Sequence, residues 1–231
     1  MTTKVKTAQA SIEYITLIGI ALIIFAAFLL VEMFMYSSFG SSANYSQVSE
    51  MGRAIVNAVN GISSQSIGST YSFSFDSPGL SSPSFFCGKI LVLNSKSGQE
   101  SAVTADINMS GVLPTNSGQF QTYVSLEKTA LGGEALISLN LPISQVIGNY
   151  KMSTGSISYN ITFLNTSGLL VPTTFDLSAL YPNDTTIFSI PESTNTGSII
   201  GSESLPTAIS SVIMLVTIPQ YSEEAGQCVS Q

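Results

Sequence analysis

The sequence lacks histidine and tryptophan, and it contains only two cysteines. The absence of histidine removes the commonest general base and a common metal ligand, and two separated cysteines cannot form a zinc site of the usual kind. The sequence also has no glycine-rich nucleotide-binding motif and no calcium-loop spacing of carboxylates. We therefore expect no enzyme activity, no metal site and no cofactor.

Charged residues are scarce as well. They make up 9% of the chain, and 14 acidic residues against 7 basic ones give a net charge of −7. A chain with this acidic balance repels nucleic acid, so we expect no nucleic-acid partner. Serine and threonine are abundant and supply solubility through hydroxyl groups. Such a surface is compatible with glycosylation, with high salt or with acid.

The single long apolar run lies near the N-terminus, at residues 14–36, and Glu32 is its one charged residue. As a helix it would be roughly 34 Å long, enough to cross a bilayer core of about 30 Å. Lys4 and Lys6 precede the run, and no basic residue follows before Arg53. This asymmetry predicts a cytoplasmic N-terminus, with the rest of the chain outside.

Four residues at the start of this run follow the pattern Gln-x-Ser-x-Glu-x-x-x-Leu: Gln9, Ser11, Glu13 and Leu17. The arrangement resembles the class III signal peptide of archaeal type IV pilin-like proteins. In that family a membrane peptidase cuts just before the glutamine. The resemblance covers the leader and the apolar run, and it implies cleavage between Ala8 and Gln9.

The resemblance also implies a structural role. The precursor would sit in the plasma membrane, be clipped by a prepilin peptidase, and pack with copies of itself into an extracellular, cell-surface helical filament. An assembly ATPase and a membrane platform protein would be further partners, and filaments of this class commonly serve adhesion. The family pattern would place Glu13 against the N-terminal amine of a neighbouring subunit, here the amine of Gln9.

Several alternatives stay open. An ordinary secretory signal needs a small-residue cleavage site after the apolar run, whereas residues 32–36 are bulky. The run could be a plain single-pass anchor. The protein could be a minor or tip subunit, or a membrane-anchored surface binding protein using the same signal. A membrane-anchored hydrolase would need two converging carboxylates. An archaellin has a similar cleaved leader but, as a rule, lacks the motif of Gln9, Ser11 and Glu13.

Small residues punctuate the apolar run. Gly19, Ala21, Ala26 and Ala27 would let neighbouring helices approach closely, although small residues are common in membrane helices in any case.

The two cysteines, Cys87 and Cys228, both follow the apolar run. A disulfide between them is plausible outside the cell and would tie the C-terminal tail to an early strand. Asn-x-Ser/Thr sequons permit N-glycosylation but are only slightly more frequent than chance gives. They lie at Asn44, Asn108, Asn160, Asn165 and Asn183.

Helical periodicity extends beyond the apolar run. It weakens at residues 37–46, where Gly40 is the expected point of loosening. It then resumes with an apolar stripe that suits docking under a head domain, either as the lower half of one helix or as a separate short helix. The stripe consists of Val48, Met51, Ile55, Val59 and Ile62.

From about residue 71 the apolar period becomes two, which predicts strands. Tyr71, Phe73 and Phe75 alternate with serines, and the stretch 157–163 alternates most regularly, with Asn160 on its wet face. Residues 212–216 are apolar throughout, which favours a central strand buried on both faces. Other expected strands are 89–94, 102–109, 121–127, 135–141, 185–190 and 208–218.

Short strands with turn-forming groups between them, and no helical pattern, predict a β-sandwich. We therefore expect an α+β protein: a long N-terminal hydrophobic helix followed by an all-β, mainly antiparallel sandwich head. An immunoglobulin-like architecture is one possibility for this head. The expected segments are a cleaved leader at 1–8, a membrane and assembly helix at 9–64, and an extracellular head at 65–231.

Overall fold

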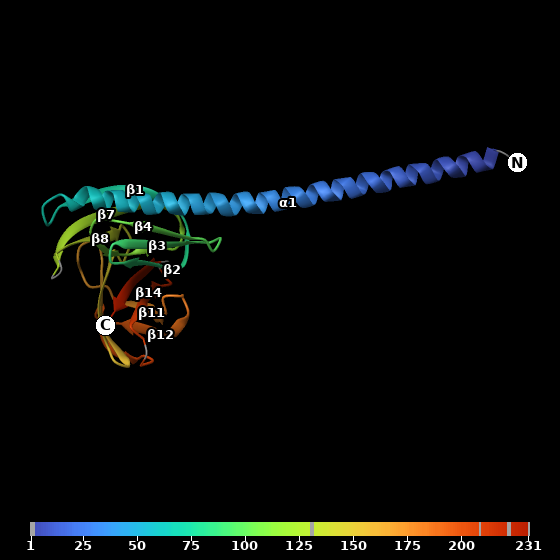
Figure 1. Cartoon of the computed structure of the whole chain (residues 1–231). Coiled ribbons are helices and arrows are strands. Elements are labelled where there is room, and N and C mark those ends of the chain that lie inside the picture. The colour runs from blue at the N-terminus through green and yellow to red at the C-terminus, as the bar shows by residue number, and fades with distance from the viewer. Residues whose placement is uncertain (1–2, 130–131, 208, 221–222, 231) are drawn as a thin grey trace. The chain divides into compact units, whose positions relative to one another are not determined.

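The computed structural model describes residues 3–129, 132–207, 209–220 and 223–230; side chains are described in these ranges except at 3–13, 36–38, 129 and 132. The chain forms two compact units, Met1–Ala43 and Asn44–Gln231. One long N-terminal helix is followed by mostly antiparallel sheets that form a sandwich-like head (Figure 1). The predicted fold class is confirmed.

The helix α1 spans Thr3–Ser63. The expectation that the helix loosens at Gly40 is wrong, because Gly40 and the residues on both sides of it are helical. A lone glycine costs a helix about 1 kcal/mol, which is too little to end a helix of this length. Of the two alternatives for the apolar stripe, the structure has the single continuous helix.

The C-terminal part of α1 packs on the head through the predicted stripe. Each of these five side chains is at most 2% exposed: Val48, Met51, Ile55, Val59 and Ile62. Gly52 brings the helix close to the head, because a Cβ there would lie 3.0 Å from Cδ1 of Leu93 and 3.1 Å from Cγ2 of Val103. The stripe is therefore part of the head's core.

Three sheets build the head. The first has the order β1–β7–β8–β5, with β1 at Thr70–Pro78, β5 at Asn108–Gly111, β7 at Ser117–Thr129 and β8 at Gly132–Leu139. The second has the order β13–β10–β9, with β9 at Gln145–Ser153, β10 at Ser156–Leu164 and β13 at Ser198–Ser204.

The third and largest sheet has the order β12–β11–β14–β15–β2–β3–β4, and β6 pairs with β15. Its strands are β2 (Leu80–Cys87), β3 (Ile90–Ser95), β4 (Glu100–Thr104), β6 (Leu113–Pro114), β11 (Thr173–Leu180), β12 (Thr186–Thr194), β14 (Ser211–Ile218) and β15 (Glu223–Ser230). Among the described strand pairs, only β5 with β8 and β15 with β2 run parallel.

The clearest sequence alternations form strands as predicted. In β10 the inward side chains are at most 4% exposed, while Asn160 faces solvent. In β1 the rings of Tyr71, Phe73 and Phe75 follow one another at 6.1 and 5.9 Å between centroids, and Phe75 is the buried one. The alternation of period two thus marks the buried face of β10 throughout, whereas in β1 the burial increases along the strand from exposed Tyr71 to buried Phe75.

The expected strand at 102–109 is wrong as a single element, because the chain leaves the third sheet after Thr104 and enters the first at Asn108. The backbone amide of Asp106 donates to the Oδ1 of Asn60 on α1, and the amide of Met109 donates to the carbonyl of Gly88. These bonds take up backbone groups that a continuous strand would have paired across one ladder.

The strands β2, β6, β9, β11, β13 and β15 were not predicted. The strand β12 also extends beyond its expected end at residue 190, through Pro191. Proline is found on edge strands, where an N–H can face away from the ladder, and β12 lies at a sheet edge.

One main hydrophobic cluster joins the α1 stripe to inward side chains of all three sheets. A second, smaller cluster lies on the opposite face of the largest sheet, since alternate residues of β14 point to opposite faces. Val212, Met214 and Val216 belong to the main cluster, whereas Ile213 and Leu215 belong to the second. The prediction of a central strand buried on both faces is confirmed.

Candidate functional site

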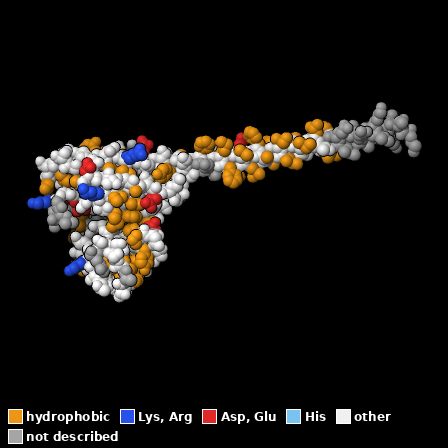
Figure 2. Space-filling model, viewed as in Figure 1, with side chains coloured by type: hydrophobic (Ala, Val, Ile, Leu, Met, Phe, Trp, Pro, Cys, Tyr) orange, Lys and Arg blue, Asp and Glu red, His pale blue; other side chains and the backbone are white. Residues whose placement is uncertain are grey.

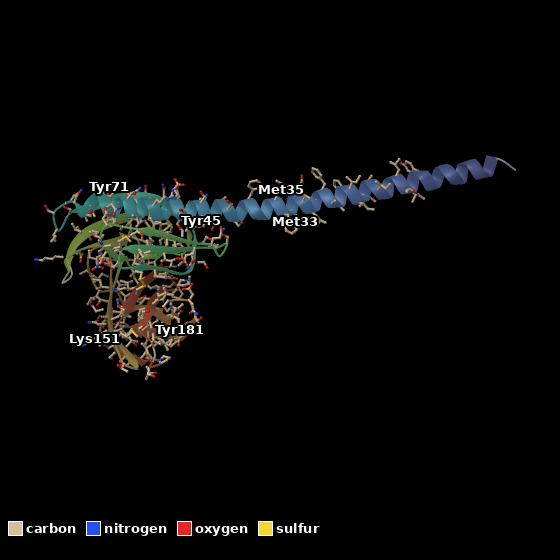
Figure 3. All side chains as sticks on the ribbon, in the orientation of Figure 1. Met33, Met35, Tyr45, Tyr71, Lys151 and Tyr181 are labelled. Atoms are coloured by element: carbon tan, nitrogen blue, oxygen red, sulfur yellow. A yellow bond between two sulfur atoms is a disulfide. The ribbon has the colours of Figure 1, made fainter. Side chains whose placement is uncertain are left out.

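The apolar segment of α1 is exposed along its length. Its large side chains from Tyr14 to Met35 have between 42% and 78% of their surface exposed. Figure 2 shows hydrophobic side chains along the visible face of this part of the helix, and Figure 3 shows Met33 and Met35 projecting from it. Soluble monomers rarely expose an apolar surface this extensive, and such a surface marks a site of contact with a membrane or another protein.

By length and composition, α1 can cross a membrane, and its place near the N-terminus also suits a signal sequence. Gly19 lies in this segment, and a Cβ placed there would meet nothing within 4 Å. Ala21, Ala26 and Ala27 are exposed as well. The predicted small residues therefore lie on open helix surface.

The residues of the predicted signal motif lie on α1. The helical backbone includes Ala8, Gln9, Ser11 and Glu13, whose side chains fall outside the described residues. Leu17, the last motif position, has 68% of its surface exposed. The structure thus places the motif at the beginning of the exposed apolar segment.

Cys87 and Cys228 form a disulfide, with their Cα atoms 4.9 Å apart. Cys87 is the last residue of β2, and Cys228 lies near the end of β15, so the bond joins two neighbouring strands from distant parts of the chain. The predicted tie between an early strand and the C-terminal segment is confirmed.

The five sequons differ in environment. Asn160 and Asn183 are exposed, whereas the other three are half-buried. The Oδ1 of Asn44 is buried without a hydrogen-bond partner, and the Oδ1 of Asn165 accepts the amides of Ser167 and Leu169 at 2.9 Å each. Because a glycan needs an asparagine side chain that is exposed to solvent, Asn160 and Asn183 are the positions where one fits best.

A recess of about 220 Å³ lies between β5, β7, β8, β9 and β15. Glu127 and Glu134 line it and lie directly opposite each other on β7 and β8. Like charges in this register weaken strand pairing. In the part of the chain that the structure describes, no group of three His, Cys, Asp or Glu side chains is arranged to hold a metal ion.

Two buried carboxyl groups were not predicted from the sequence. Glu223 and Glu224, the first residues of β15, are 0% and 1% exposed. Burial raises the pKa of Glu223 to about 8 and that of Glu224 to about 7. Adjacent acidic residues near a chain end ordinarily indicate a solvated surface, so no sequence signal marked them.

No protein-family model and no curated protein matches the chain. Among solved structures, it is similar to a DUF3823 family protein from Bacteroides ovatus ATCC 8483, with 9% sequence identity and a TM-score of 0.33. The match covers 70% of this chain and 97% of that one. A likeness this distant carries no inference about function.

Proposed function

We propose that this chain is the precursor of an archaeal type IV pilin-like subunit that builds a surface filament through its N-terminal helix. One observation carries the proposal: the Gln9, Ser11, Glu13 and Leu17 pattern stands directly at a helix segment whose apolar side chains are exposed. The segment would first lie in the membrane and then exchange lipid for the same segment of other copies. The protein works as a structural subunit, not as an enzyme.

The leader would end at Ala8. Removing it would expose the amine of Gln9, which Glu13 of a neighbouring copy would meet inside the apolar filament core. A carboxylate among apolar helices is costly unless it has a partner, so this contact would fix the axial register between subunits. A repeated contact of this head-to-tail kind gives an open filament when its rotation does not close.

Mass spectrometry of the N-terminus tests the proposal. Protein recovered from sheared cell-surface material is expected to begin at Gln9, with the glutamine free or cyclised. A chain that begins near Met1 and occurs only in the membrane fraction would contradict the filament and favour a plain anchored surface protein.

The substitution Glu13→Ala is expected to lower the yield of sheared filaments on the order of tenfold or more, because it leaves the partner amine without its counterpart in an apolar setting. The effect is measured by immunoblot as the amount of the protein in the sheared filament fraction, divided by its total amount in the cells. Glu32→Ala is the matched control, since Glu32 lies on the same helix and is exposed. Equal losses in both variants would remove the special role of Glu13.

A minor or tip subunit, or an anchored surface binding protein with the same signal, is the second candidate. The recess lined by Glu127 and Glu134 is the observation that favours it, because a binding module needs an accessible hollow in its head. Abundance discriminates the two: a major subunit dominates the sheared filament protein, whereas a tip subunit is a trace component.

A further inference from the structure

The start of β15 holds two carboxyl groups in the interior of the head. Glu223 lies opposite Ile218 of β14 and Pro114 of β6, and Glu224 lies opposite Thr217 and Leu113. Strand neighbours thus flank both residues on both sides. A carboxyl group in such a position is shielded from water and needs protein partners in order to be ionised.

Most of the carboxyl oxygens lack such partners. One oxygen of Glu224 accepts the backbone N–H of Ser84, and the Ser82 side chain also hydrogen-bonds this carboxyl group. The other oxygen of Glu224 and both oxygens of Glu223 have no hydrogen-bond partner among the described residues. An ionised, buried carboxylate without partners is far more costly than a neutral carboxyl group.

In the described part of the strands packed against β15, no opposite charge compensates the two carboxyl groups. The strands packed against β15 are β14, β2, β9, β6 and β5. Within these strands, the titratable groups other than the disulfide are Tyr150 and Lys151 of β9. Lys151 is exposed at the far end of the unit from α1 (Figure 3), and burial alone raises the pKa of Glu223. Each of the two glutamates, pointing to its own face of the sheet, therefore lies in an uncharged interior.

We propose that the packing of β15 in the head depends on the protonation of Glu223 and Glu224. The strand is held in place when both carboxyl groups are neutral, and it loosens when they ionise. The disulfide at Cys228 keeps the other end of the strand attached to β2. Loosening would therefore start at the Glu223 end of β15 and expose the core under Ala225, which belongs to the main cluster. The inference does not depend on the filament role.

The direction of the pH effect follows from the raised pKa values of Glu223 and Glu224. An unfolded glutamate titrates near pH 4.5, whereas the folded groups titrate at about 8 and about 7. Between these limits the folded chain binds more protons than the unfolded chain. The stabilisation is therefore complete in acid, below about 4.5, and it is lost as the pH rises through 7 and 8. The head is suited to acidic surroundings.

Hydrogen exchange on the full chain in detergent micelles tests the proposal. After correction for intrinsic rates, amide exchange in β14 and β15 is expected to be roughly tenfold or more faster at about pH 8 than at about pH 5, since each pKa unit is a tenfold factor. The double variant E223Q/E224Q is expected to lose most of this dependence. E100Q, at an exposed position of β4, should keep it.

A second measurement serves if the double variant does not fold. Infrared spectroscopy of the native chain at about pH 6 is expected to show protonated carboxyl groups, because ordinary glutamates are ionised there. The band should disappear above pH 8 or so. Absence of this band, or exchange in β15 that is equally slow at both pH values, would overturn the proposal.

Discussion

Replacing Cys87 and Cys228 together by serine is expected to lower the free energy of unfolding of the head by about 3 to 5 kcal/mol. The bond joins residues 141 positions apart, and closing a loop of this length in the unfolded chain accounts for roughly 5 kcal/mol in the chain-entropy model. The ladder between β15 and β2 has one paired position, Gln227 with Phe86, and the Ser84 amide of β2 also donates to Glu224 of β15. The disulfide thus adds a covalent link to a short ladder.

Thermal unfolding of the full chain in micelles measures this loss, and a decrease of the melting temperature on the order of 10 °C is expected for a domain of this size. Reducing the native chain should reproduce the decrease, whereas the double serine variant should not respond to reductant. A native chain that melts at the same temperature with and without reductant would show that the strand pairing holds β15 without the bond.

The sequence predicted those elements whose periodicity carries an unambiguous hydrophobic face. The α1 stripe and β10 show this: every apolar position of the pattern is buried, and Asn160 between them is exposed. The strand β11 was missed although Phe175, Leu177 and Ala179 alternate, because small and polar residues dilute the signal. The strands β13 and β15 contain glycine and glutamate, which propensity assigns to loops.

Tertiary context explains the remaining differences. Glycines in strands are one example: Gly201 lies opposite Tyr159, whose ring covers the space where a Cβ would stand. A glycine weakens a strand on its own, and the aromatic neighbour compensates in the folded sheet. Likewise, Glu223 and Glu224 pair with β6 on one side, and β6 lies so far away in the sequence that no local pattern reports this contact.

The features of the candidate site also differ in whether the sequence predicts them. The disulfide could be predicted because the chain offers one pairing of two cysteines, and the apolar segment because its composition decides its environment. The two facing carboxylates of the recess, Glu127 and Glu134, could not be predicted, since their meeting depends on the register between β7 and β8. A register follows from turn geometry and burial, and the residues between these strands carry no decisive turn signal.

The substitution Ile55→Asp is expected to destabilise the head by more than about 4 kcal/mol, because it places a carboxylate where the isoleucine side chain has no exposed surface. Ile55 is the middle residue of the α1 stripe, between Met51 and Val59, which are buried as well. Hydrogen exchange of residues 48–62, together with thermal unfolding, measures the effect. Ile55→Val, which removes one methylene group, should cost only about 1 kcal/mol.

Asn57→Asp is the matched control, since it adds the same charge two residues away on the exposed side of α1. If Ile55→Asp and Asn57→Asp destabilise equally, the stripe is not the docking face. If the stripe is the docking face, the Ile55→Asp variant should still insert into membranes, because residue 55 lies outside the exposed segment from Tyr14 to Met35. The converse holds for Glu13→Ala, which should reduce filament yield and leave the melting of the head unchanged. The two substitutions together therefore separate the part of α1 that folds with its own chain from the part whose apolar side chains need other molecules.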